Sequence, residues 1–181
     1  NTAVFFPHAI EFKPDGTKMF LASNNSQTSI YQYNLTTPWD SSTVVWEKRF
    51  QIGNTTESDL RTLSFKPDGT RMFTGGSNQG KIRAYILTNP WDITTSGVSL
   101  EAVSANLKTS SDTNFRNTQF DTTGSIMYIM GNTNNNIHKY TLSTPWDVTT
   151  LSSTSTEYDT GSRFSEMRGF IFAASFTKLF V

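Results

Sequence analysis

One nine-residue segment occurs twice almost unchanged in this chain and a third time in altered form. It reads FKPDGTKMF at 12–20, FKPDGTRMF at 65–73 and FDTTGSIMY at 120–128. The leading residues Phe12, Phe65 and Phe120 lie 53 and 55 residues apart, and each copy is followed by a Pro-Trp-Asp tripeptide. A period just above fifty residues predicts a repeat architecture, in which each repeat is one small unit that packs against the next.

Short apolar stretches separated by turn residues predict four strands in each unit. In the first unit, Ile10 and Phe12 alternate with polar residues, as a half-buried strand requires. The Pro-Asp-Gly at 14–16 predicts a tight turn, because Pro presets φ, Asp bonds to nearby backbone and Gly accepts a positive φ. The chain returns after this turn as a second strand at 17–22, and two more strands are expected at 29–35 and 44–50. Four short strands joined by tight turns are typical of a β-propeller blade.

The predicted fold class is therefore all-β: a single β-propeller domain of four-stranded antiparallel blades, with about three and a half blades present. The expected blades cover residues 1–53, 54–107, 108–160 and, incompletely, 161–181. Such an arc leaves apolar faces and a strand edge uncovered. We therefore expect the 181 residues to be a fragment of a longer chain, whose further blades, or other protein subunits, complete the ring.

Composition excludes several classes of function. The chain carries 15 basic and 15 acidic residues, which opposes a broad electrostatic contact with nucleic acid. It has no apolar run long enough for a membrane-spanning helix and no cysteine for a disulfide or a thiolate. Abundant Asn, Thr and Ser favour a solvated β surface and an extracellular, cell-surface or virion location.

The pattern F-x-P-D-G-T-x-M-F followed by I-x-x-Y-x-L-x-T-P-W-D resembles β-propeller repeats of bacterial and phage surface or structural proteins. It is similar in layout to the repeats of YVTN-type and WD-repeat propellers, and the resemblance covers nearly the whole chain. The resemblance implies a propeller that acts as a binding platform or an adhesin or, less often, as an enzyme. A fold alone does not decide among these functions.

A tryptophan and an aspartate recur together in every complete unit. A large ring present in each repeat is expected to pack between neighbouring blades at equivalent buried positions, with a sugar-binding platform as the alternative. Each aspartate is expected to accept hydrogen bonds from the backbone of its turn. The residues are Trp39, Asp40, Trp91, Asp92, Trp146 and Asp147.

A basic residue lies four positions before the leading phenylalanine of every unit, which is Phe12, Phe65, Phe120 or Phe172. Because the first strand of a propeller blade is the innermost, these side chains are expected near the mouth of the central channel. Guanidinium groups there form a candidate ligand-binding site for an anion. The alternative is a structural role in which they pair with nearby acids such as Glu57, Asp59 and Asp112. The series comprises His8, Arg61, Arg116 and Arg168.

No catalytic residue, metal site or cofactor site is assigned from the sequence. The two histidines, His8 and His138, lie in different units without metal-ligand spacing.

The expected function is a non-enzymatic propeller segment of a larger surface or virion structural protein. It acts in adhesion, receptor binding or assembly, with a glycan or an anion as ligand. The alternative is a lactonase-like or glycan-active propeller enzyme whose site lies at the channel mouth and uses an acid such as Glu57 or Asp59. A pocket with a buried, perturbed carboxylate in one blade favours that alternative.

Overall fold

The computed structural model describes residues 6–24, 28–53, 57–108, 112, 114–131, 133–160, 168–173 and 178–180. These residues form three four-stranded antiparallel sheets and one two-stranded sheet, which confirms the predicted fold class. Blade 1 contains β1 (Pro7–Phe12), β2 (Lys18–Ser23), β3 (Ser29–Leu35) and β4 (Val44–Gln51). Blade 2 contains β5 (Leu60–Phe65), β6 (Arg71–Gly76), β7 (Ile82–Leu87) and β8 (Val98–Val103). Blade 3 contains β9 (Phe115–Phe120), β10 (Ile126–Gly131), β11 (Asn136–Thr141) and β12 (Thr156–Asp159), and a final pair contains β13 (Ile171–Ala173) and β14 (Lys178–Phe180).

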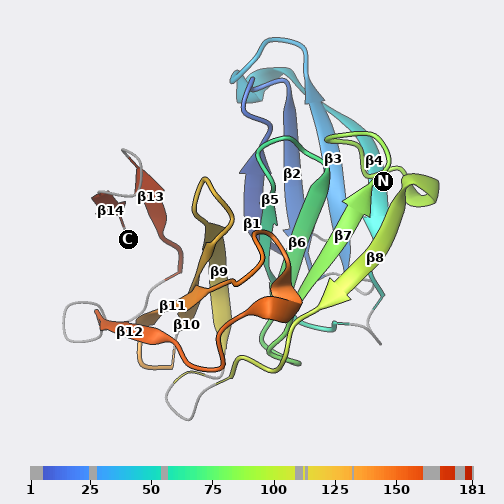
Figure 1. Cartoon of the computed structure of the whole chain (residues 1–181). Helices are drawn as coiled ribbons and strands as arrows, with labels where there is room; N and C mark the ends of the chain where they lie inside the picture. Colours follow the sequence, from blue (N-terminus) through green and yellow to red (C-terminus); the bar gives the residue numbers. More distant parts are fainter. Residues whose placement is uncertain are drawn as a thin grey trace.

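The blades are arranged around their first strands. β1 contacts β5 and β5 contacts β9, while the strand order inside each sheet follows the chain from the innermost to the outermost strand (Figure 1). Three-residue 3-10 turns, η1 (Ser41–Thr43), η2 (Thr95–Gly97) and η3 (Val148–Thr150), follow the Pro-Trp-Asp segments. Among the described residues, no helix has the length and apolar character needed to cross a membrane.

The turn between the first two strands is built by the repeated Asp and Gly. The carboxylate of Asp15 accepts a hydrogen bond from the Thr17 backbone N–H at 3.0 Å. In the third blade, which lacks this Asp, the hydroxyl of Thr123 accepts from the Ser125 N–H at 3.2 Å instead. Gly16 has a φ of +73°, a left-handed conformation that favours glycine. The altered third copy therefore keeps the turn by a different side chain.

Each Pro-Trp-Asp segment closes onto that turn in the same way. The tryptophans have positive φ angles of 64°, 59° and 66°. Their backbone N–H groups donate to the carbonyls of the turn glycines at 3.0–3.1 Å. Each following aspartate accepts a hydrogen bond from the backbone N–H two residues later, as predicted for the aspartates of these turns. These contacts join Trp39, Trp91 and Trp146 to Gly16, Gly69 and Gly124 respectively.

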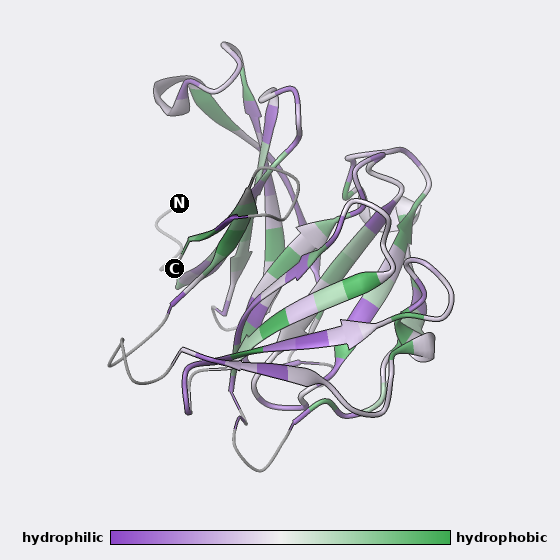
Figure 2. Cartoon of the chain, turned by 60° about the vertical axis from the view of Figure 1, so that its left-hand side comes forward, coloured by the Kyte–Doolittle hydropathy of each residue, from purple (hydrophilic) through white to green (hydrophobic). Residues whose placement is uncertain are grey.

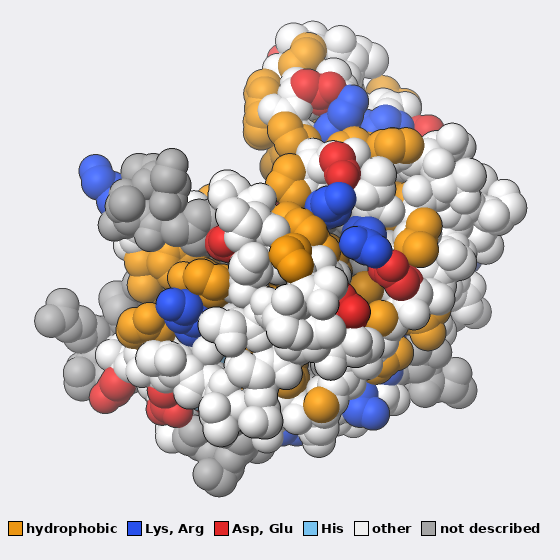
Figure 3. Space-filling view, viewed as in Figure 1, with side chains coloured by type: hydrophobic (Ala, Val, Ile, Leu, Met, Phe, Trp, Pro, Cys, Tyr) orange, Lys and Arg blue, Asp and Glu red, His pale blue; other side chains and the backbone are white. Residues whose placement is uncertain are grey.

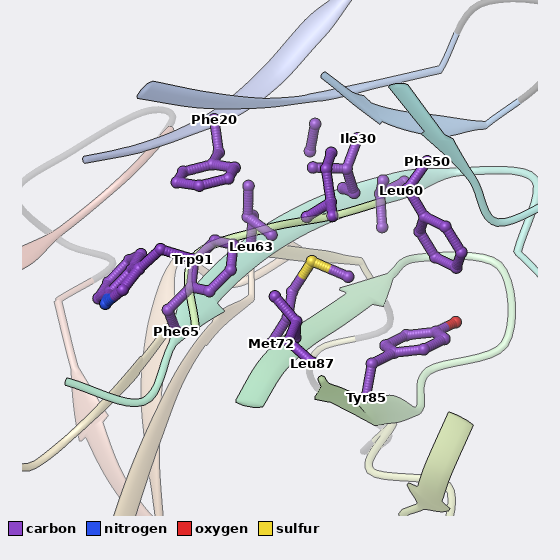
Figure 4. Packing of buried hydrophobic residues seen from close by; sticks show 12 residues of the cluster. Phe20, Ile30, Phe50, Leu60, Leu63, Phe65, Met72, Tyr85, Leu87 and Trp91 are labelled. Carbon is purple, nitrogen blue, oxygen red and sulfur yellow. The ribbon is translucent and has the colours of Figure 1, made fainter. Parts of the chain in front are cut away.

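Aromatic stacking holds neighbouring blades together. The ring of Trp91 lies 4.9 Å from Phe65 of its own blade and 6.1 Å from Phe20 of blade 1 (centroid distances). Figure 4 shows these rings in the apolar cluster that fills the space between blades 1 and 2. Trp146 makes the same pair of contacts one blade later, with Phe120 at 5.4 Å and Phe73 at 6.0 Å. Figure 2 shows the apolar stretches along the strands that supply these clusters.

The prediction that all three tryptophans are buried is wrong for Trp39. Trp91 and Trp146 expose 7% and 8% of their surface, whereas Trp39 exposes 61%. Its ring still lies 5.5 Å from Phe12 of its own blade. The difference arises because, among the described residues, no blade precedes blade 1 to supply the second ring.

Candidate functional site

A cavity of about 660 Å³ lies against the innermost strands, and we call it the axial cavity. It runs past β1, β5 and β9 and reaches the segment around β13. A concave space at the centre of a fold is the usual place for a ligand site. Its polar lining includes His8, Glu11, Ser64, Arg116, Gln119 and Arg168.

The structure brings the predicted basic series together. Nη1 of Arg61 lies 2.9 Å from Nδ1 of His8, and Nη2 of Arg61 lies 2.7 Å from Oδ1 of Asp59. Arg116 and Arg168 line the axial cavity next to His8. Partial burial lowers the pKa of His8, and the positive charges of the three arginines lower it further. One end of the cavity is therefore rich in positive charge.

The acids proposed from the sequence as catalytic partners are held in structural contacts instead. Asp59 accepts hydrogen bonds from Ser77 Oγ at 2.5 Å and Asn24 Nδ2 at 2.8 Å, in addition to its pair with Arg61. Burial raises the pKa of Asp59, but these hydrogen bonds outweigh burial and hold it below its usual value. Neither Asp59 nor Glu57 is among the residues that line the axial cavity.

Glu57 stabilises the segment that leads into blade 2. It exposes only 1% of its surface, and its Oε1 accepts the Asp59 N–H at 3.1 Å. Its Oε2 lies 3.6 Å from Nη1 of Arg83 on β7. Blade 3 repeats this arrangement with Asp112 and His138, whose Oδ2 and Nε2 lie 3.0 Å apart. In both blades an acid before the first strand pairs with a base on the third strand.

Together with Ser155, the Asp112–His138 pair has the composition of a catalytic triad. Nδ1 of His138 lies 3.3 Å from Oγ of Ser155. Asp112 also accepts the backbone N–H groups of Thr133 and Asn134 at 2.9 and 3.0 Å. The equivalence with the Glu57–Arg83 pair of blade 2 assigns Asp112 and His138 to loop attachment. Among the described residues, no group of three or more His, Asp or Glu side chains is arranged to hold a metal ion.

Sequence reasoning missed Glu11, which is half-buried and lines the axial cavity. Burial raises the pKa of its carboxyl from 4.5 to about 7. In register it pairs with Phe20, so it lies on the side of blade 1 that faces blade 2. The positions equivalent to Glu11, one residue before the leading phenylalanine, hold uncharged residues in the other units: Ser64, Gln119 and Ile171.

Glu11 therefore breaks the repeat at one point of the cavity wall. The sequence signal that could have identified it is this contrast among the four aligned units. Its distance from the basic end follows from the strand, because three residues of extended chain separate it from His8, or about 10 Å. A ligand held by its anionic group at the basic end can thus extend toward the Glu11 carboxyl.

Two amides on β9 attach the last pair of strands to the cavity wall. Asn117 Nδ2 donates to the Phe170 carbonyl at 2.6 Å, and Gln119 Oε1 accepts the Phe172 N–H at 2.9 Å. The segment that carries Arg168 is thereby fixed next to β9. This attachment places Arg168 beside the cavity that Arg116 also lines.

No protein-family model and no curated protein matches this chain. Solved structures do match. A "putative 6-phosphogluconolactonase" from Bacteroides uniformis is 17% identical with a TM-score of 0.65, covering 97% of this chain and 46% of that one. Another from Bacteroides fragilis is 15% identical with a TM-score of 0.66, covering 97% and 47%. A protein from Lactobacillus plantarum is 15% identical with a TM-score of 0.58, covering 84% and 42%.

The chain spans less than half the length of each of these three structures. At such low identity the similarity carries information about the fold and not about the reaction. Together with the three four-stranded sheets, it shows that the chain folds as part of a β-propeller.

Proposed function

We propose that this chain is part of a propeller hydrolase that opens an anionic sugar lactone in the axial cavity. The observation that carries the proposal is Glu11, the carboxyl in the cavity wall whose pKa burial raises to about 7. A general base works best when its pKa lies near the working pH, and perturbed carboxyls in clefts are frequent catalytic groups. The uncharged residues at the equivalent positions of the other units favour a specific role over a role in the repeat.

The basic end supplies the second requirement, which is to hold the substrate. Guanidinium groups bind carboxylate or phosphate through charge-assisted, bidentate hydrogen bonds. Arg116, Arg168 and His8 line the cavity at that end. Holding the anionic group there orients the lactone carbonyl toward Glu11 and lowers the entropic cost of the reaction.

In the proposed step, the Glu11 carboxylate removes a proton from water while the water oxygen bonds to the lactone carbonyl carbon. The tetrahedral intermediate then collapses and the ring C–O bond breaks. The departing alkoxide takes the proton from Glu11, which leaves the open hydroxy acid and restores the carboxylate. The two similar Bacteroides structures carry the name "putative 6-phosphogluconolactonase", so lactone opening is a reaction that has been assigned to proteins of this fold.

The test is hydrolysis of glucono-δ-lactone and its 6-phosphate by the protein at its full natural length. Glu11→Gln keeps the size of the side chain and removes the base, so kcat is expected to fall about 100-fold while KM changes little. Glu101→Gln on β8 is the matched control, because it removes one carboxylate from an outer strand. A Glu11→Gln variant that hydrolyses both lactones at the wild-type rate contradicts the assignment.

A surface or virion protein that acts in adhesion, receptor binding or assembly stays the second proposal. The repeated Arg series favours it, since binding an anion or a glycan acid needs the cations and no base. Calorimetry with a 6-phosphate sugar acid then shows binding that Arg116→Gln weakens and Glu11→Gln leaves unchanged. Binding without turnover in the wild type selects this function over the hydrolase.

A further inference from the structure

We propose that the open face of blade 1 is the docking surface for a further four-stranded blade of the same repeat. The open face is the side of blade 1 that faces away from blade 2. In Figure 3, apolar side chains (orange) lie along the left edge of the upper blade, which Figure 1 labels β1 to β4. An apolar sheet face of this kind marks an interaction site. The open face includes Ile10, Phe12, Leu21, Tyr33, Trp39 and Trp46.

The two existing blade interfaces define what such a neighbour supplies. The ring of Trp91 is covered by Phe20 on β2, and the ring of Trp146 by Phe73 on β6. Phe20 and Phe73 occupy the same position of the second strand in consecutive blades. Trp39 has the same backbone geometry as the other two tryptophans and lacks this covering ring among the described residues. The occupant therefore presents an aromatic residue at that second-strand position.

Polar contacts between blades 1 and 2 show what the outer strands of the docked blade must also supply. Lys48 Nζ on β4 lies 2.9 Å from Oδ1 of Asp92, and Gln32 Oε1 on β3 accepts the Ile93 N–H at 2.9 Å. Asp40 has the position of Asp92 on the open face. The occupant is therefore expected to bring a basic side chain to Asp40 from its fourth strand.

The final strand pair of a second copy fits this surface less well. Phe180 on β14 has the position of Phe20 and exposes 54% of its surface, so it could cover Trp39. The described residues of that sheet, however, form two strands only. Two strands alone leave Tyr33, Trp46 and Asp40 without contacts, because the corresponding contacts to blade 2 come from the third and fourth strands of blade 1. A complete blade is thus the occupant that the contacts favour.

Docking of this blade also bears on the axial cavity. Ile10 lies both on the open face and in the cavity lining, and it exposes 54% of its surface. A blade against β1 covers Ile10 and extends the cavity wall beyond blade 1. The docking surface and the candidate site are therefore neighbours that share this side chain.

Oxidative footprinting of the protein at its full natural length, read by mass spectrometry, tests whether the face is covered. Trp39 is expected to oxidise as slowly as Trp91 and Trp146, which serve as internal controls. Rapid oxidation of Trp39 beside two protected tryptophans means that the face stays open and overturns the proposal.

A photo-cross-linker identifies the occupant. With p-benzoylphenylalanine replacing Trp39, the expected cross-link joins position 39 to the second strand of another complete unit. The same substitution at Trp91 is the control and is expected to mark the peptide that contains Phe20. A cross-link from position 39 to 178–180 of a second copy, or to a segment without the repeat, overturns the proposal of a further blade.

Discussion

Glu11 shows how a single side chain acquires chemistry from its surroundings. Its carboxyl lies on a strand that packs against blade 2, and burial there disfavours the charged form. The same residue type on an outer strand forms ordinary ion pairs: Glu101 holds both Nε and Nη2 of Arg71, the former at 2.7 Å. Position in the blade therefore decides whether a glutamate is a candidate base or a surface charge.

The raised pKa of Glu11 makes a prediction about stability. Because the pKa of its carboxyl is about 7 in the folded state and 4.5 in a solvated, unfolded chain, its contribution to stability is full below about pH 4.5 and is lost as pH rises through 7. Glu11→Gln removes this loss. Between pH 5 and pH 8, the free energy of unfolding of the variant is therefore expected to rise by about 1–3 kcal/mol relative to that of the wild type.

Urea unfolding of both proteins at the two pH values measures the gain. Glu101→Gln is the control and is expected to show no comparable gain between them. A Glu11→Gln difference that is the same at pH 5 and pH 8 shows that the carboxyl titrates normally.

At the residue scale, sequence reasoning placed His8, Arg116 and Arg168 beside the cavity. It did not place Arg61, which is absent from the cavity lining and pairs with Asp59, and it placed the acids poorly. The place of the three residues beside the cavity follows from their position in or just before the first strand, which repeat spacing reveals. The role of Glu57 depends on the direction of its side chain toward Arg83, which lies on a strand two positions away in the sheet. The pKa of Glu11 depends on burial between blades, and no local pattern encodes that burial.

At the element scale, the hairpin turn and the Pro-Trp-Asp segment form one unit. A Cβ placed on Gly69 would lie 2.1 Å from the Trp91 ring, and Gly69 has a φ of +74°. This explains why Gly16, Gly69 and Gly124 persist while the Asp of the turn is replaced in the third copy. The tryptophan ring thus fits only where the turn residue is glycine, and the turn between the first two strands depends on both residues.

Gly69→Ala is therefore expected to be strongly destabilising. The strained φ and the collision with Trp91 add, and together they cost about 2–4 kcal/mol. Gly97→Ala is the matched control in the same blade, because the nearest atom to its Cβ lies at 3.6 Å. Thermal unfolding of the two variants measures the difference, and equal melting temperatures speak against the coupled turn.

The loop attachment of blade 3 gives a second test at this scale. His138→Ala removes the ring nitrogen that lies 3.0 Å from the buried Oδ2 of Asp112, and loss of this hydrogen bond is expected to cost about 1–3 kcal/mol of stability. Ser155→Ala removes only a 3.3 Å contact and is expected to cost less than about 1 kcal/mol. Both variants are expected to keep lactone turnover at permissive temperature. Loss of turnover in Ser155→Ala, with stability intact, assigns catalysis to Ser155 instead.

At the scale of the whole molecule, the repeat predicts what happens inside a blade better than what happens between blades. Strand positions and turn chemistry follow from local residues, so they are read from one unit. The exposure of Trp39 depends on whether another blade packs against blade 1. The sequence of the repeat is the same in either case. This is why burial was predicted correctly for Trp91 and Trp146 and wrongly for Trp39.

The same dependence sets the order in which the molecule opens. Blade 2 packs against a large apolar cluster on each of its faces. Blade 3 has a large cluster on one face and a smaller one on the other, where two amide side chains also hold the segment around β13. Nearest-neighbour coupling of this kind makes local unfolding start at the ends of an array and progress inward. When the 181 residues are studied as they stand, amide hydrogen exchange is expected to be slowest in β5–β7 and fastest in β13 and β14. Adding a blade to either end then slows exchange in the blade it touches before it affects any other, so the array is stabilised one interface at a time.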